Sequence, residues 1–334
     1  MRKIVIALLL AVLQILCLTA CSGKDGPAPT TAAPTKTTTA PTQQTTVPPE
    51  TTQPPATMPP PVIYDHTTTE VYQVKKWYKN IQTAKMEGVT AEGKEFHIPT
   101  TEDRYKVMQG CCTDGKYMYA FLEKKNQDVD GETRSLCRVF KVDLETWEVL
   151  EMSEPLKVDH ANGVTYNTKT NEIFVTHFNY NSYLISVVDP ETLTVTRSFE
   201  LEHPSRGLAY NAEMDQYAVL VYGKSDIVIY DADWKELAYY ECAIPNLAKQ
   251  CMSWDGKYLY MSYTGALDAD TRGSEVIACY DWNGNFCGVF RLASYYELES
   301  TIHVNGETYM AFNNDGCKVF RLKMNMIELL EPQN

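Results

Sequence analysis

Basic residues are scarce in this sequence relative to acidic ones. The 334 residues include 30 Lys and Arg against 43 Asp and Glu, a formal net charge of −13 at pH 7. Residues 1–61 carry four basic and two acidic residues, a net of +2, which leaves −15 on residues 62–334. Phosphate binding rests on clustered Lys and Arg, so this balance argues against a nucleic-acid partner. It also disfavours simple electrostatic capture of an anionic cell-wall polymer.

Several signals of catalysis and cofactor binding are also missing. The sequence has no CxxC pair, no Cys/His spacing typical of zinc and no GxSxG nucleophile turn. His160, His177 and His203 could converge as zinc ligands, but hydrogen-bonded loop histidines are the favoured interpretation. Neither of the loops with alternating aspartates has the full calcium pattern; these loops contain Asp128 and Asp130, and Asp268 and Asp270. We therefore predict no metal and no cofactor.

The N-terminus is an export signal. It reads MRKIVIALLLAVLQILCLTAC, a basic start followed by an apolar run and small residues. The end of this run, Leu18-Thr19-Ala20-Cys21, resembles the bacterial lipoprotein signal, which implies that residues 1–20 are removed and Cys21 is acylated, for example with palmitate. The run is short for a transmembrane span, for which roughly 20 apolar residues are needed, and Gln14 interrupts it. We expect an outward-facing protein that a lipid anchors to the cell membrane.

Residues 21–61 form a predicted disordered stalk. Eleven of the seventeen prolines lie in residues 26–61, where only Lys36 and Glu50 are charged. Such a composition has almost nothing to bury and cannot form a core. Proline favours an extended polyproline II chain, so the segment should act as a semi-rigid spacer.

A repeated pattern fills the rest of the chain, where no long helical pattern occurs. In each repeat a polar residue opens an apolar stretch, and Asp or Asn follows five residues later before an aromatic-rich strand. The repeats begin at Gln109, Asn162, Arg206, Gln250 and Ser300, which are 53, 44, 44 and 50 residues apart. Self-similarity at about 40–50 residues is typical of propellers.

A second pattern completes each unit. A strand, an Asp that can close an Asx-turn and another strand recur around Asp143, Asp189, Asp231 and Asp281. Each unit thus predicts a four-stranded antiparallel blade. The fifth unit lacks its outer strand, which a segment near residues 93–99 could supply to close the ring. We predict an all-β, five-bladed β-propeller over residues 91–330, preceded by an N-terminal strap at 62–90.

The segments DGKYLYMSY, HANGVTYNTKTNEIFV and IVIYDAD resemble those of secreted bacterial propellers of the YVTN/NHL-like kind. More narrowly, they resemble the five-bladed propeller of phage receptor-binding proteins and of proteins from teichoic-acid gene clusters. This resemblance covers nearly all of residues 100–323 and implies the propeller fold. It also implies binding to surface glycopolymers, which the acidic charge does not favour.

In a propeller, the residues that open the repeats surround one mouth of the central channel. Polar groups that converge at such a mouth indicate a binding site, although they could equally hydrogen-bond loop backbones and channel water. The predicted ligand-binding residues are Gln109, His160, Asn162, His203, Arg206, Lys249, Gln250, Glu299 and Ser300.

Non-catalytic recognition of a glycan, a peptide or an envelope protein is the favoured function. One alternative is a carbohydrate-active lyase or hydrolase that uses His160, Arg206 and Glu299 for acid–base chemistry. A glycosidase would need two carboxylates that flank the bond. A scaffold that seats another envelope protein is a further alternative. Cys279 and Cys287 flank a predicted hairpin and could form a disulfide, which geometry must decide.

Overall fold

The computed structural model describes residues 82–330, except 225, 243–247, 265–273 and 295. The predicted signal and stalk, the first part of the strap, Asp268 and Asp270 lie outside the described residues. The described part is all-β apart from one helix of five residues, α2 (Met326–Leu330). None of its helices is long and apolar enough to cross a membrane.

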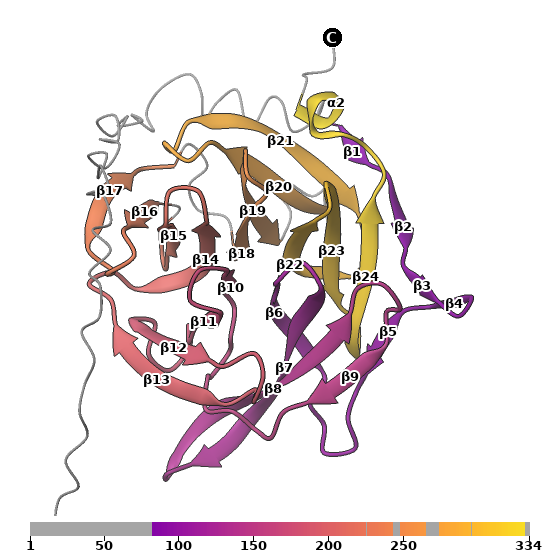
Figure 1. Ribbon diagram of the computed structural model, residues 1–334, viewed down its shortest axis with the longest axis vertical. Helices are drawn as coiled ribbons and strands as arrows, with labels where there is room; N and C mark the ends of the chain where they lie inside the picture. The colour runs from indigo at the N-terminus through magenta and orange to yellow at the C-terminus, as the bar shows by residue number, and fades with distance from the viewer. Residues whose placement is uncertain (1–81, 225, 243–247, 265–273, 295, 331–334) are drawn as a thin grey trace, which may run out of the picture. The chain divides into compact units, whose positions relative to one another are not determined.

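Three sheets are built on four antiparallel strands that follow one another in the chain (Figure 1). The first consists of β10 (Val164–Asn167), β11 (Glu172–Thr176), β12 (Leu184–Val188) and β13 (Val195–Glu200). The second consists of β14 (Ser205–Asn211), β15 (Gln216–Val221), β16 (Ile227–Tyr230) and β17 (Glu236–Tyr240). The third consists of β18 (Ala248–Trp254), β19 (Leu259–Thr264), β20 (Ser274–Tyr280) and β21 (Phe286–Ala293), and β1 (Thr83–Ala84) adds a parallel strand to β21.

The remaining large sheet combines both ends of the described chain. One part consists of β6 (Val107–Thr113), β7 (Tyr117–Val129), β8 (Glu132–Asp143) and β9 (Val149–Met152). The other part consists of β22 (Glu297–Val304), β23 (Glu307–Asn313) and β24 (Gly316–Leu322), with β2 (Met86–Gly88) and β5 (His97–Pro99) antiparallel to β24. A single parallel bridge between β24 and β6 joins them. The short strands β3 (Thr90–Ala91) and β4 (Lys94–Glu95) form a separate pair.

The aspartates of the second sequence pattern close the outer turns, as predicted. The Oδ1 atom of Asp143 accepts hydrogen bonds from the backbone N–H groups of Glu145 and Thr146, both at 2.9 Å. Asp189, Asp231 and Asp281 make the same kind of turn. These Asx-turns fix the hairpins between the third and fourth strands of their sheets.

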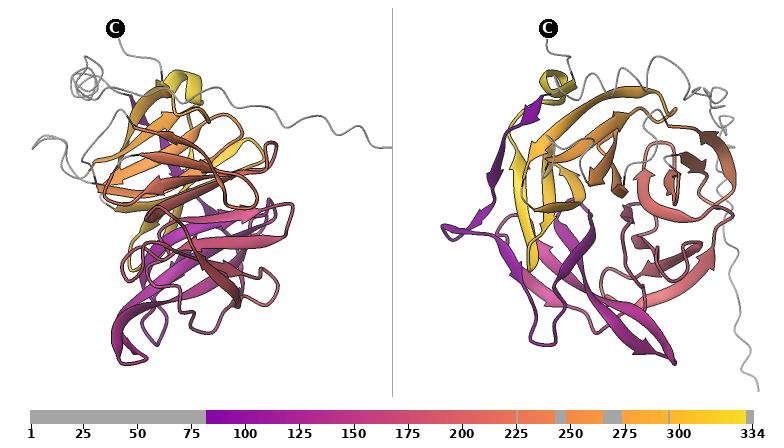
Figure 2. Two further views of the ribbon diagram at one scale, coloured as in Figure 1. Left: turned by 90° about the vertical axis from the view of Figure 1, so that its left-hand side faces the viewer. Right: turned by 180° about the vertical axis from the view of Figure 1, so that it is seen from behind.

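The first strands of the sheets contact one another in a closed cycle. Strand β6 contacts β10, β10 contacts β14, β14 contacts β18, β18 contacts β22, and β22 contacts β6. Figure 2 shows the sheets fanning outwards from these strands. This arrangement is propeller-like, and it brings the ends of strands that are far apart in the sequence to one central region.

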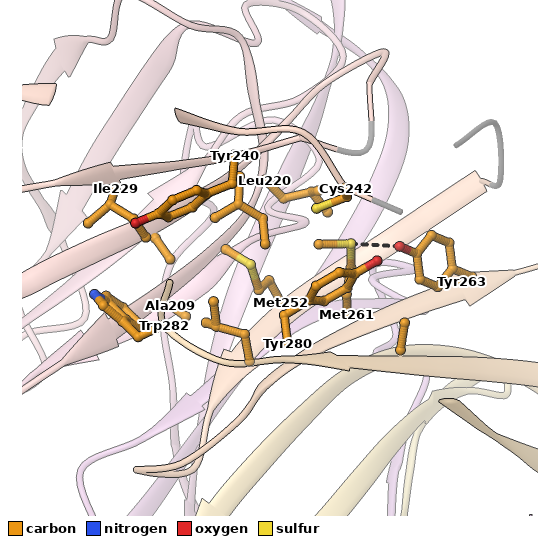
Figure 3. Packing of buried hydrophobic residues seen from close by; sticks show 14 of the residues in the cluster. Ala209, Leu220, Ile229, Tyr240, Cys242, Met252, Met261, Tyr263, Tyr280 and Trp282 are labelled. Atoms are coloured by element: carbon orange, nitrogen blue, oxygen red, sulfur yellow. Dashed lines mark hydrogen bonds between the residues drawn. The ribbon is translucent and has the colours of Figure 1, made fainter. Parts of the chain in front are cut away.

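Apolar side chains fill the space between adjacent sheets. In Figure 3, Ile229 and Tyr240 of one sheet face Met261 and Tyr280 of the next, and all four are buried. Trp282 lies in the same layer. Because an apolar layer lies on each side of a sheet, each sheet buries both of its faces. This burial explains the continuous apolar runs of the strands.

The sequence analysis did not identify the short helix near the end of the described chain. Residues 326–330 form α2, which contacts β21. Leu329 is 1% exposed in the cluster that also contains Leu292 and Phe312. Burial of this leucine accounts for a helix that was too short to be detected by its period.

Candidate functional site

Polar side chains gather where the first strands begin. Asn162 donates a hydrogen bond from Nδ2 to the carbonyl oxygen of Gln250 at 3.0 Å. Arg206 donates from its Nη2 to the Gln250 Oε1 atom at 2.7 Å. Ser300 reaches across to β6, where its Oγ accepts from the backbone N–H of Cys111 at 3.1 Å. The structure thus brings together side chains from separate repeats, as a channel mouth requires.

Irregular pairing near the start of four first strands positions these residues. The register shifts between Met108 and Cys111, Ser205 and Gly207, Lys249 and Met252, and Leu298 and Ser300. A β-bulge leaves one residue out of the ladder and redirects its side chain. Gln109, Arg206, Gln250 and Glu299 lie within these shifts, so the bulges explain why polar residues fit there.

Glu123 lies at the centre of one half of this region, and the sequence analysis missed it. Its side chain is fully buried, and Oε1 lies 2.8 Å from Nδ1 of His160. Gln109 donates from Nε2 to the other carboxylate oxygen at 3.4 Å. A carboxylate at the end of the apolar run of β7 was the only signal in the sequence.

Three further glutamates, Glu275, Glu297 and Glu299, lie close enough to one another for their charges to interact. Gln250 donates from Nε2 to Oε1 of Glu297 at 2.5 Å. Burial, and then the negative charge of Glu297, raise the pKa of Glu275 to about 8. Burial and Glu297 also raise the pKa of Glu299 well above its usual value. The charge of Glu275 adds to this shift, and Arg206 partly opposes it. We call Glu123, Glu275, Glu297 and Glu299 the acidic group.

The guanidinium of Arg206 connects the two halves of the region. Its Cζ atom lies 4.3 Å from the ring centroid of Phe178, whose ring centroid is 5.3 Å from that of His160. Burial lowers the pKa of Arg206, and the carboxylate of Glu299 opposes this shift. Arg206 retains its charge because an arginine guanidinium stays protonated in proteins.

Several buried polar atoms of this region have no hydrogen-bond partner among the described residues. Four of these atoms are oxygens, namely Gln109 Oε1, Asn162 Oδ1, Glu275 Oε2 and Glu299 Oε2, and the fifth is Arg206 Nε. Buried polar atoms are normally paired, and leaving one unpaired costs about 1–3 kcal/mol. These four oxygens can accept hydrogen bonds from donors outside the protein chain.

The other predicted site residues lie elsewhere or are less defined. His203 Nε2 lies 2.9 Å from Glu236 Oε2 on β17, the last strand of its sheet, so the structure does not bring it to the acidic group. Lys249 pairs through its backbone with Tyr263, and its side chain lies outside what the structure describes. His177 bonds to Ser186 instead. In the described part of the chain, no three His, Cys, Asp or Glu residues are placed to hold a metal ion.

A cavity of about 310 Å³ lies at the opposite end of the same first strands. Its lining includes Thr165, Tyr210, Ser253, Trp254 and His303. The sequence analysis placed the candidate site only where these strands begin, and it did not consider their ends. The repeat could have revealed this cavity, because Ser253 and His303 occupy the same position in their repeats, three residues after the residue that opens each one.

The cysteine pair that could have formed a disulfide is reduced in the structure. Cys279 is buried and Cys287 is partly exposed, and both are free thiols. The Cα partner of Cys279 across the hairpin is Gly288 rather than Cys287.

Solved structures show similarity in fold. A crystal structure of glutaminyl cyclase from Myxococcus xanthus aligns with a TM-score of 0.51 and 10% identity, over 72% of this chain and 98% of that chain. Hydrazine synthase from Kuenenia stuttgartiensis aligns with a TM-score of 0.38 and 13% identity, over 67% of this chain and 59% of that one. At 10% identity, the cyclase shows that the fold is propeller-like and nothing about activity.

Sequence comparisons add no family to this picture. No protein-family model and no curated protein matches the chain. The resemblance to propellers of phage receptor-binding and teichoic-acid-cluster proteins therefore stays a prediction.

Proposed function

We propose that the chain is a cell-surface lipoprotein with a five-bladed β-propeller. In this proposal an acyl chain on Cys21 anchors it, residues 21–61 form the stalk, and β5 supplies the missing outer strand. The lipobox residues and the Thr/Pro composition support the first two parts. The closed cycle of first strands and the pairing of β5 with β24 support the third.

The acidic group is the binding site in this proposal, and the ligand carries a protonated amine. The observation behind it is the set of four buried oxygens without a partner among the described residues, two of which belong to Glu275 and Glu299. An ammonium group has three N–H donors and no acceptor, so it matches such a set. Its positive charge also favours the ionised forms of Glu275 and Glu299, whose pKa values burial and Glu297 raise.

Arg206 contributes selectivity. Its unpaired Nε donor lies in the same region, stacked on Phe178. A ligand with an amine and a nearby carbonyl or carboxylate would satisfy both the acidic group and the guanidinium. Peptide N-termini, lysine-like side chains and amino sugars have this chemistry, which agrees with a peptide, protein or glycan partner.

Non-catalytic binding accounts for the geometry better than the carbohydrate-active enzyme does. His160 is bonded to Glu123, and the ring of Phe178 packs against both His160 and the Arg206 guanidinium. Among the described residues, no hydrogen bond joins His160 to Arg206 or Glu299, so the three side chains do not form the acid–base set that the enzyme would use.

A thermal-shift screen of the full-length chain tests the proposal. The panel contains peptides and amino sugars with free amines, their N-acetylated counterparts, and cell-wall fragments. We expect free amines to raise the melting temperature and acetylated compounds to fail. Glu299→Gln should weaken binding at least about tenfold, since it removes a carboxylate that pairs with the cation. Glu151→Gln, an exposed change on β9, is the matched control.

The alternatives predict other results. An enzyme would release product from an envelope polysaccharide, and His160→Ala would stop that release. A scaffold would ignore the whole panel and co-purify with an envelope protein after mild crosslinking. The binding proposal fails if free and acetylated amines act equally, or if Glu299→Gln and Glu151→Gln bind alike.

A further inference from the structure

The cavity at the far end of the first strands contains a serine and a histidine in contact. Ser253 lies on β18 and His303 on β22, which are neighbouring first strands. Ser253 Oγ is 2.8 Å from His303 Nε2. Thr301 Oγ1 also contacts Ser253 Oγ. Ser253, Thr301 and His303 all line the cavity of about 310 Å³.

A second hydrogen bond orients the imidazole of this pair. His303 Nδ1 lies 3.0 Å from Thr308 Oγ1. The ring also packs on Tyr260, with 4.4 Å between the two ring centroids. Tyr260 donates from its hydroxyl to Asp255 Oδ2 at 2.7 Å, since a carboxylate accepts and does not donate.

A neutral imidazole has one protonated and one unprotonated ring nitrogen. Base chemistry at Ser253 requires the tautomer with the proton on Nδ1. In that tautomer, His303 Nδ1–H donates to Thr308 Oγ1 and the lone pair of Nε2 points at the Ser253 hydroxyl. Burial lowers the pKa of His303 to about 4, so the ring is neutral at pH 7.

A hydroxyl held against an imidazole whose far nitrogen is oriented by a third group is the arrangement of an activated nucleophile. We propose that Ser253 is a nucleophile with His303 as its general base, in a second site that cleaves small uncharged esters. The cavity is at the lower end of the size range of ligand pockets. Glu213 is the one charged side chain in its described lining, which favours an uncharged substrate.

The reaction balances without a cofactor. Ser253 Oγ bonds to the ester carbonyl carbon while His303 Nε2 takes the hydroxyl proton. The ester C–O bond breaks, and His303 returns the proton to the departing alcohol. Water then attacks the acyl-serine, which releases the carboxylic acid and restores the Ser253 hydroxyl. This site is independent of the amine site proposed above.

The chain offers a matched control elsewhere. Ser186 Oγ lies 2.7 Å from His177 Nε2, a pair of the same kind. Both of its residues are buried, burial lowers the pKa of His177 to about 4, and neither lines the cavity. The two pairs therefore differ in access to a substrate, and His303 has the additional contact of its Nδ1 with Thr308.

Labelling of the full-length chain with diisopropyl fluorophosphate tests the inference. This uncharged reagent bonds its phosphorus to the serine oxygen, fluoride leaves, and the proton passes to His303. We expect one adduct, located on Ser253 by peptide mass spectrometry. Ser253→Ala should lose the adduct, and Ser186→Ala should keep it at the wild-type rate.

Two further variants separate chemistry from folding. His303→Gln should slow labelling at least about 100-fold, which is the usual contribution of a general base. Tyr260→Phe should slow it less, because the phenyl ring preserves the packing on His303 and the change removes only the hydrogen bond to Asp255. Absence of an adduct on wild-type Ser253, equal labelling of Ser186, or an unchanged rate in His303→Gln would overturn the proposal.

Discussion

Replacement of Gly163 by alanine tests the closeness of the first strands. Gly163 directly precedes β10, and a Cβ atom there would lie 2.7 Å from the carbonyl oxygen of Arg206 and 2.8 Å from Cα of Gly207. Both obstacles are backbone atoms at the start of β14. They cannot rotate away, so the two strands must move apart by several tenths of an ångström.

The magnitude follows from the cost of overpacking. Added methyl groups in a packed interior cost about 1–3 kcal/mol, and a clash with backbone on a neighbouring sheet belongs at the upper end. For a domain of this size, each kcal/mol lowers the melting temperature by about 2–4 °C. We expect Gly163→Ala to lose about 3 kcal/mol of unfolding free energy and about 6–12 °C.

Gly88→Ala is the matched control. The nearest atom to a Cβ at Gly88 is Glu95 Oε1 at 3.4 Å, which is ordinary contact. Both variants reduce the entropy of the unfolded chain equally, so their difference isolates the clash. The assay is thermal unfolding followed by circular dichroism. Equal melting temperatures for the two variants would refute the close approach of β10 and β14.

Three other variants or reactions extend these tests. Glu275 has a pKa of about 8 in the folded chain against an ordinary 4.5, so its contribution to stability falls as pH rises between these values; Glu275→Gln should raise the melting temperature more at pH 8 than at pH 5. Glu123→Ala should cost about 1–3 kcal/mol in urea unfolding, because it leaves buried Gln109 and part-buried His160 without their partner; a loss below 1 kcal/mol would contradict the Glu123–His160 contact. Cys287 should react with iodoacetamide well before buried Cys279, as measured by peptide mapping. The reverse order of modification would contradict the burial of Cys279.

The repeat in the sequence predicted much of the architecture. The Asp positions fixed the outer turns, and the apolar runs fixed strands buried on both faces. The periodicity could not reveal α2, which depends on the burial of Leu329 against a sheet formed by distant residues. It also could not show how β1 and β2 attach, since short edge strands have no pattern of their own.

The candidate site was only partly accessible to the same reasoning. Asn162, Arg206 and Gln250 meet because each occupies the same place in its repeat. Glu123 and Glu275 lie on the second and third strands of their sheets, where no repeat position marks them. Their role depends on strand length and on bulges, which are tertiary properties. His203 was grouped with the site by its closeness to Arg206 in sequence, yet its ring turns towards β17.

Proton release on ligand binding tests the amine site most directly. Glu275, with a pKa of about 8, holds a proton at pH 7, and the pKa of Glu299 is also raised. An ammonium group that binds beside these carboxyls lowers their pKa and expels protons. Calorimetric titration with an amine from the screen, repeated in buffers of different ionisation enthalpy, should show close to one proton released per ligand at pH 7. Binding without proton release, or with proton uptake, would contradict the account.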